Sequence, residues 1–220
     1  MIQVTDIRKS YGSLHVLRGV SLAIPDHSIA AIVGPSGAGK STLLHIIGTL
    51  DRPDSGQVVY DGVDVASMSD RRLSRFRNEH IGFVFQAHQL LPEFTLLENV
   101  MMPALIAGKS PSRAAEMARP LLKEVGLGDR LDHKPTELSG GEAQRGAVAR
   151  ALVNSPSVVL ADEPSGSLDS RNRQELHDLF FRLRDLHGTT FVTVTHDESL
   201  ASRCDCVYRI TDGEISQCDI

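Results

Sequence analysis

The sequence has no tryptophan and only three cysteines among its 220 residues. These cysteines, Cys204, Cys206 and Cys218, are all near the C-terminus, are odd in number and include no Cys-x-x-Cys pair. A disulfide framework and a zinc site built from paired cysteines are therefore not expected. We expect the chain to work in a reducing compartment such as the cytosol.

The sequence also lacks an excess of positive charge. It has 23 Lys and Arg against 28 Asp and Glu, a net charge of -5, and its pI is near 6.0. A broad nucleic-acid surface needs clustered basic residues, so this balance argues against one. The densest basic group is best explained as the solvated face of a helix; it consists of Arg71, Arg72, Arg75 and Arg77.

No apolar run in the sequence approaches the length that spans a bilayer, and Met1–Asp6 has no signal-peptide pattern. We therefore expect a soluble chain whose role at a membrane, if it has one, depends on a partner. A chain of 220 residues can bury a sizeable core and suits one domain with a smaller inserted lobe.

What the sequence does contain is a glycine-rich stretch, Gly34–Thr42, between two apolar runs. The run before it, Ile29–Val33, predicts a buried strand, and the run after it, Leu43–Ile47, predicts a helix. This is the context of a phosphate-binding loop, in which backbone N–H groups and a helix start cradle a polyphosphate. Lys40 is expected to reach the outer phosphates, and the Ser41 hydroxyl to bind magnesium.

The segments that flank this loop predict a small antiparallel sheet. Ile2–Ile7 and Val20–Ile24 alternate in short runs typical of strands, and Gln57–Tyr60 followed by Asp61-Gly62 predicts a strand that enters a hairpin. Tyr11 precedes the loop, where its ring is suited to stack on a nucleotide base.

Ile81–Gln86 predicts a strand that ends in a polar residue. The amide oxygen of Gln86 is suited to contact magnesium or the attacking water. The following stretch, Leu90–Leu97, has several large apolar side chains and is interrupted by Pro92. It indicates a docking groove and a buried segment equally well.

Two helices are predicted next, and the second begins with a distinctive motif. Ser112–Val125 has a helical pattern that we expect to be broken at Pro120. Ser139 and Glu142 then form a Ser-x-x-Glu capping box at the start of the second helix. The two glycines between them weaken its first turn by up to about 1 kcal/mol each, which indicates that the backbone approaches a ligand closely. This helix start is a second candidate phosphate site.

Ser157–Pro164 is an apolar run typical of a central parallel strand, and it ends in two carboxylates. Adjacent side chains on a strand point to opposite faces, so Asp162 and Glu163 cannot perform the same task. Asp162 is suited to the magnesium shell, and Glu163 to polarising the water that attacks the terminal phosphate.

Three more features follow in order. A turn after this strand ends at Asp169, whose carboxylate is suited to hydrogen bonding across an interface. Arg171–Leu186 predicts an amphipathic helix. Thr190–His196 predicts another core strand, and His196 at its end is suited to contact a terminal phosphate or its water, because the ends of parallel strands meet at one crevice.

In this order, the motifs resemble the nucleotide-binding subunits of ATP-binding-cassette (ABC) transporters over essentially the whole chain. The Ser-Gly-Gly-Glu box separates this family from kinases and GTPases that share the phosphate loop. The resemblance implies an α/β fold: a RecA-like P-loop NTPase core with an antiparallel β subdomain and an inserted α-helical subdomain. The core and β subdomain would span about residues 1–87 and 155–220 of a single domain, and the helical subdomain about 88–154. Some positions depart from the commoner family pattern; they are Ala143, Gly146, Ser165 and Ser167.

The resemblance also implies an ATPase that works as a head-to-tail dimer with ATP and Mg²⁺. Glu163 would be the catalytic base, His196 its companion, and Gln86 the sensor of a membrane partner. The magnesium ligands would be Ser41, Gln86 and Asp162. ATP would be bound by Tyr11, Gly34, Pro35, Ser36, Gly37, Ala38, Gly39, Lys40, Ser41, Thr42 and Asp162, and from the other chain by Ser139, Gly140, Gly141, Glu142 and Asp169.

Within the family, Gly82–Thr95, with Glu98–Val100 after it, is most similar to the lipoprotein-releasing LolD group. It is also similar to the ATPase domain of MacB and to FtsE, so an exporter or a cell-division complex stays open. The resemblance implies two copies at the cytoplasmic face of the inner membrane, under permease subunits like LolC and LolE that dock near Gln86 to Leu97.

Two non-transport members of the superfamily are less compatible with the sequence. A DNA-maintenance ATPase needs a long heptad-bearing insertion between Gln86 and Ser139, and none is present. A ribosome-associated factor carries two cassettes in one chain, whereas this chain has one.

Overall fold

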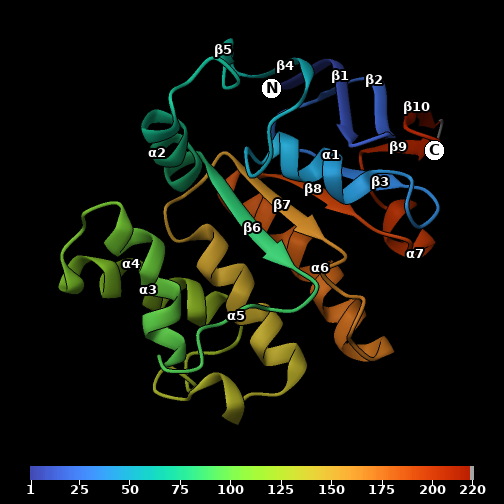
Figure 1. Ribbon diagram of the computed structural model, residues 1–220. Coiled ribbons are helices and arrows are strands. Elements are labelled where there is room, and N and C mark those ends of the chain that lie inside the picture. The colour runs from blue at the N-terminus through green and yellow to red at the C-terminus, as the bar shows by residue number, and fades with distance from the viewer. Residues whose placement is uncertain (219–220) are drawn as a thin grey trace. The chain divides into compact units, whose positions relative to one another are not determined.

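The computed structural model describes residues 1–218 (Figure 1), and clustering of contacts divides the chain into two units. The first unit comprises residues 1–74 together with the segment from Thr190 onward, and the second comprises residues 75–189. Helix α2 (Asp70–His80) lies at the point where the chain passes from the first unit to the second.

The first unit contains the predicted antiparallel sheet, with strand order β2-β1-β4-β5. Its strands are β1 (Ile2–Tyr11), β2 (Leu14–Ile24), β4 (Ser55–Tyr60) and β5 (Val63–Asp64). The hairpin between β4 and β5 is confirmed, and both of its turn residues have positive φ angles, 47° at Asp61 and 83° at Gly62. That pattern matches the turn whose twist suits a two-residue hairpin.

The first unit also holds a parallel arrangement around β3 (Ile29–Val33). β3 pairs in parallel with β8 (Thr190–Val194) and with β9 (Cys206–Thr211), and β9 pairs antiparallel with β10 (Glu214–Cys218). All five residues of β8 are buried, as expected of a strand covered on both faces. The helices α1 (Lys40–Ile47) and α7 (Glu198–Ala201) follow β3 and β8 in the chain.

The second unit contains two parallel strands, β6 (Ile81–Phe85) and β7 (Val158–Asp162). Their register pairs Ile81 with Val158 and Phe85 with Asp162, so both strands end at the same level. The residues that follow the two strands, Gln86 and Glu163, are therefore neighbours at one edge.

Four α-helices complete the second unit, with a short 3₁₀ helix, η1 (Pro135–Glu137), between two of them. α3, α4 and α5 pack on one another, and α5 also packs on α6 (Figure 1). Gly146 of α5 allows this close packing, because a Cβ atom there would lie 2.6 Å from Leu96 Cδ1. The helices are α3 (Leu96–Ile106), α4 (Pro111–Glu124), α5 (Gly140–Leu152) and α6 (Ser170–His187).

The predicted break at Pro120 is wrong. Pro120 lies inside α4, which continues unbroken to Glu124. The proline removes one backbone hydrogen bond. The residues around it, Ala118, Leu121 and Leu122, are buried, and burial of that apolar face holds the helix together across the proline.

Candidate functional site

The glycine-rich loop has a backbone that only glycine accommodates at its key positions. Gly37 and Gly39 have φ angles of 79° and 101°, and Gly39 is the N-cap of α1. A Cβ atom at Gly34 would lie 2.2 Å from the carbonyl oxygen of Ile210, so the loop begins pressed against β9. The chain is thus turned sharply from β3 into α1, which directs the helix start and its partial positive charge at the loop.

Lys40 folds over this loop. Its Nζ atom donates hydrogen bonds to the carbonyl oxygens of Gly34 and Pro35, both at 3.0 Å. An ammonium held above the loop backbone at the start of α1 is a cation suited to polyphosphate. The residues of the loop therefore fit the phosphate site that the sequence predicts.

Tyr11 lies at the end of β1 and is half exposed. Its hydroxyl donates to Asp51 Oδ2 at 2.6 Å, and the ammonium of Lys9 lies 5.1 Å from the centre of its ring. Lys9 also donates to Asp51 Oδ1 at 2.8 Å. The bond to Asp51 raises the pKa of the Tyr11 hydroxyl. Asp51 thus fixes the orientation of the ring, a role that sequence reasoning missed because no local pattern links Tyr11 to a residue forty positions later.

His196 lies two residues beyond the end of β8 and is exposed. It lines a cavity of about 410 Å³ together with Gly34, the first residue of the phosphate loop. The first unit therefore brings the loop and His196 to one cavity, as the parallel pairing of β3 and β8 predicts.

In the second unit, the structure brings Gln86 close to the turn that follows the two acidic residues. A Cβ atom at Gly166 would lie 3.1 Å from Gln86 Nε2, and the N–H of Gly166 donates to the carbonyl oxygen of Glu163 at 3.0 Å. Asp162 and Glu163 are both half-buried. Glu163 has a φ angle of 46°, an uncommon left-handed conformation for a residue of this type. Strained backbone of this kind occurs preferentially at functional sites.

The loop after β6 is anchored to α5, the helix that begins with the capping box. Gln144, which is 2% exposed, donates to the carbonyl oxygen of Phe85 at 2.8 Å. Arg150 donates to the carbonyl oxygens of His88 at 2.9 Å and Gln89 at 2.6 Å. Sequence reasoning gave no role to Gln144 or Arg150, because their partners lie about sixty residues away.

The stretch Leu90–Leu97 is buried in part and exposed in part. Leu90, Leu96 and Leu97 are buried, whereas Leu91 and Phe94 are 42% and 37% exposed. A buried amide, that of Asn99, shapes the exposed part. Its Nδ2 donates to the carbonyl oxygens of Leu91, Phe94 and Thr95, and its Oδ1 accepts from the N–H of Leu91. Two apolar side chains are thus presented on a fixed loop.

The capping box at the start of α5 is confirmed. The N–H of Glu142 donates to Ser139 Oγ at 3.2 Å, and the N–H of Ser139 donates to Glu142 Oε2 at 2.8 Å. The Ser139 backbone N–H, with its hydroxyl and the Arg130 guanidinium, lowers the pKa of Glu142. Ser139 and Gly140 are exposed, so the N-terminal end of α5 faces outward from the second unit.

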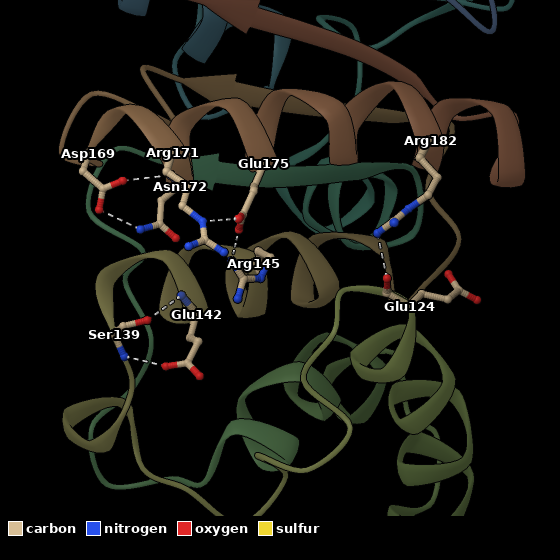
Figure 2. Close-up of polar contacts among 9 residues, drawn as sticks. All are labelled: Glu124, Ser139, Glu142, Arg145, Asp169, Arg171, Asn172, Glu175 and Arg182. Atoms are coloured by element: carbon tan, nitrogen blue, oxygen red, sulfur yellow. Dashed lines mark hydrogen bonds and ion pairs between the residues drawn. The ribbon is translucent and has the colours of Figure 1, made fainter.

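Asp169 is the N-cap of α6 and is exposed. Its Oδ1 accepts from the backbone N–H of Asn172 at 2.8 Å, and its Oδ2 accepts from the side-chain amide of Asn172 at 2.7 Å (Figure 2). These bonds lower the pKa of the Asp169 carboxyl group. Asn172 is a further residue that sequence reasoning missed.

Residues 1–218 contain no cluster of three or more His, Cys, Asp or Glu side chains that would form a metal site. A magnesium ion bound with a nucleotide needs only one or two protein ligands, since phosphates and waters complete its shell. The hydroxyl and carboxylate predicted for it are oxygen ligands of the kind that Mg²⁺ prefers. Over the same residues, no helix is both long enough and apolar enough to cross a membrane.

Comparison with protein families gives a match to the ABC transporter family over residues 17–166. The chain belongs to this family. Among curated proteins, the lipoprotein-releasing system ATP-binding protein LolD of Bacteroides thetaiotaomicron is 60% identical, with 99% of this chain and 100% of the relative covered. The protein of the same name from Geobacter metallireducens is 55% identical, with 98% and 97% covered. The predicted family and the resemblance to the LolD group are confirmed.

Solved structures support the same assignment for this ABC-family chain. A dimeric ATP-binding cassette in a post-hydrolysis state, bound to ADP and phosphate, has a TM-score of 0.89 and 37% identity, covering 99% of this chain and 98% of the other. A second structure of the same cassette, described as a dimeric bacterial ABC transporter cassette, has the same TM-score at 38% identity, with 98% and 97% covered. The predicted α/β fold of a P-loop ATPase cassette is therefore confirmed.

Proposed function

We propose that this chain is the ATP-hydrolysing subunit of an ABC transporter that releases lipoproteins from the inner membrane. The observation that carries the proposal is the phosphate loop, in which Gly34, Gly37 and Gly39 shape the backbone and Lys40 lies over it. The curated relatives that share about 60% identity over nearly the whole chain are named as ATP-binding proteins of the lipoprotein-releasing system.

ATP is held by the loop from Gly34 to Thr42, with Lys40 on its outer phosphates and Tyr11 against its base. The orientation of the Tyr11 ring is set by Asp51 before any nucleotide arrives. Ser41, Asp162 and Gln86 hold the magnesium ion, which neutralises charge on the phosphates when it is bound.

Hydrolysis depends on residues at the ends of β6, β7 and β8. Glu163 polarises the water, and its half-buried position limits competition from bulk solvent. His196, which shares a cavity with Gly34, contacts the terminal phosphate or its water. Gln86, beside the turn that follows Glu163, reports the state of the site to the loop after β6.

Two copies pair head to tail, and each supplies Ser139 to Glu142 and Asp169 to the nucleotide held by the other. Support comes from the exposure of Ser139, Gly140 and Asp169, and from the partial positive charge of the α5 N-terminus. The related solved cassette is described as dimeric in both of its structures. ATP thus closes the pair, and hydrolysis lets it reopen.

Membrane subunits similar to LolC and LolE dock near Gln86 to Leu97, so the chain lies peripherally on the cytoplasmic face of the inner membrane. Leu91 and Phe94 offer the apolar contacts, and Gln144 and Arg150 tie this loop to α5. We also propose that the helical subdomain spans about residues 88–154, with the core and β subdomain on either side of it in the chain.

Two substitutions test the proposal, one at the proposed catalytic base and one in the phosphate loop. Glu163→Gln keeps the shape of the side chain but removes the base, so ATP still binds and turnover falls by about 10² to 10⁴. Lys40→Ala removes the cation from the loop, so ATP binding itself weakens. Steady-state ATPase rates measure turnover in each variant, and equilibrium binding of a fluorescent ATP analogue measures its affinity for ATP. Normal turnover in Glu163→Gln, or unchanged ATP affinity in Lys40→Ala, would contradict the proposal.

A further inference from the structure

The side chain of Asn172 lies between the starts of two helices, α5 and α6 (Figure 2). On the α6 side, its Nδ2 donates to Asp169 Oδ2 at 2.7 Å, in addition to the backbone bond that caps the helix at 2.8 Å. An N-cap requires only the backbone bond. The side-chain bond is therefore an additional constraint, and it occupies the second carboxylate oxygen of Asp169.

On the α5 side, the same amide is pressed against Gly141. A Cβ atom at Gly141 would lie 2.3 Å from Asn172 Oδ1 and 2.7 Å from its Cγ, distances at which real Cβ atoms are not found. A side chain at position 141 would therefore collide with this amide, and glycine lets the backbone of α5 lie this close to Asn172. Gly141 is buried at this contact.

Other contacts between the two helix starts are weaker. Leu168 Cδ2 would be 3.8 Å from a Cβ atom at Gly140, an ordinary van der Waals distance. One turn further along, Arg145 lies 3.6 Å from Glu175, which also pairs with Arg171 at 3.0 Å (Figure 2). Arg145 and Glu175 are 20% and 46% exposed, so solvent screens this inter-helix pair in part, and it lies beyond the first turns of the two helices. Asn172 is thus the tightest link between the first turns of α5 and α6.

We propose that Asn172 is a positioning residue that holds the first turn of α5 and the carboxylate of Asp169 as one rigid element. The inference rests on the proposed function, in which both parts face the nucleotide held by the partner copy. Because one amide contacts Gly141 through its oxygen and Asp169 through its nitrogen, movement of either helix start shifts the other. The first turn of α5 and the Asp169 carboxylate therefore reach the partner's nucleotide site as one unit.

Two substitutions distinguish the contact of Asn172 with Gly141 from its hydrogen bond to Asp169. Asn172→Ala removes both side-chain contacts but keeps the backbone N–H that caps α6. Asn172→Asp keeps the shape against Gly141 but replaces the donor with an oxygen that repels Asp169. The matched control is Gln174→Ala on the same helix, which removes a side-chain amide bonded to Asp178 at 3.0 Å on the exposed surface.

The first measurement is amide hydrogen exchange of nucleotide-free protein at Glu142 and Ala143, whose N–H groups close the first turn of α5. Exchange there becomes severalfold faster in Asn172→Ala and stays as in the parent in Gln174→Ala. The second measurement is ATP-dependent dimer formation in a Glu163→Gln background. The dimer affinity falls about tenfold in Asn172→Ala and in Asn172→Asp, while the affinity of the monomer for ATP stays within twofold.

Each outcome decides the inference. Unchanged exchange in Asn172→Ala overturns it, because the first turn of α5 is then independent of Asn172. Faster exchange with unchanged dimer affinity also overturns it, since Asn172 then packs the helices without positioning them. If the Glu163→Gln parent itself forms no dimer with ATP, the proposed function fails, while the exchange measurement still decides whether Asn172 couples the two helix starts.

Discussion

Among single residues, Glu163 and Asp51 best illustrate how the chain prepares its chemistry before a ligand binds. Glu163 adopts a φ angle of 46°, and the carbonyl oxygen of this residue accepts the N–H of Gly166. Its strain, of order 1–3 kcal/mol, persists because the surrounding turn holds it. Glu163 is one of several non-glycine residues with a positive φ angle, and it is also the residue to which we assign the catalytic base.

Asp51 orients the ring of Tyr11, which we assign to stacking on the nucleotide base. Burial raises the pKa of the Asp51 carboxyl group, but the hydrogen bonds from Lys9 and Tyr11 outweigh burial and leave this pKa below its ordinary value. The carboxylate is thus charged at neutral pH and accepts from both side chains. The three groups form one small network at the end of β1.

Asp51→Ala releases the ring of Tyr11, and we expect ATP affinity to fall by roughly 3- to 10-fold, the range of one aromatic stacking contact. The maximal rate of hydrolysis should change little, because the phosphate loop is untouched. Equilibrium binding of a fluorescent ATP analogue measures the change. The matched control is Asp70→Ala, which removes an exposed carboxylate paired with Arg52 at 2.6 Å. Equal affinity in both variants would show that Asp51 does not orient the base contact.

Among the secondary-structure elements, two helices of the second unit, α3 and α5, have well-defined N-termini. α3 and α5 both begin with a capping box, from Thr95 to Glu98 and from Ser139 to Glu142. Each satisfies backbone donors that would otherwise lack partners at a helix N-terminus. These two helices pack on each other, so the proposed docking stretch and the α5 start belong to one framework.

The capping boxes make this framework sensitive to acid. The pKa of Glu142 in the folded protein is lowered below its ordinary value of 4.5, so its contribution to stability is fully present above that pH. The contribution is lost as the pH falls through the lowered pKa. We expect Glu142→Gln, which keeps an acceptor without a charge, to lose less stability than the parent between about pH 4.5 and 3. Urea unfolding across this range measures the difference; parallel curves would contradict the expectation.

At the scale of the whole molecule, features with a local pattern were predictable from the sequence. The phosphate loop follows from its own spacing, and the α5 capping box from Ser139 and Glu142. The apolar run that ends at Asp162 and Glu163 identified β7. In each case, residues close in sequence carry the whole signal.

Features that depend on contacts between distant segments were not predictable. The predicted break at Pro120 was wrong because tertiary burial outweighed a local rule. Asp51, Gln144 and Asn172 were missed because their roles come from tertiary contacts that no spacing encodes. The contact between Gly141 and Asn172 was missed for the same reason, because it joins two different helices.

The central claim is that the N-terminus of α5 completes the nucleotide site of a second copy. Ser139→Asp tests it most directly, because aspartate caps a helix as well as serine does but places a negative charge where the partner's phosphates would lie. Thr95→Asp is the matched control, since it makes the same kind of change in the other capping box.

The measurement is sedimentation of Glu163→Gln protein with saturating ATP and Mg²⁺, with and without each added substitution. We predict that the parent and the Thr95→Asp variant sediment as dimers, whereas the Ser139→Asp variant stays monomeric and still binds ATP. A dimer of equal affinity in Ser139→Asp would contradict the account.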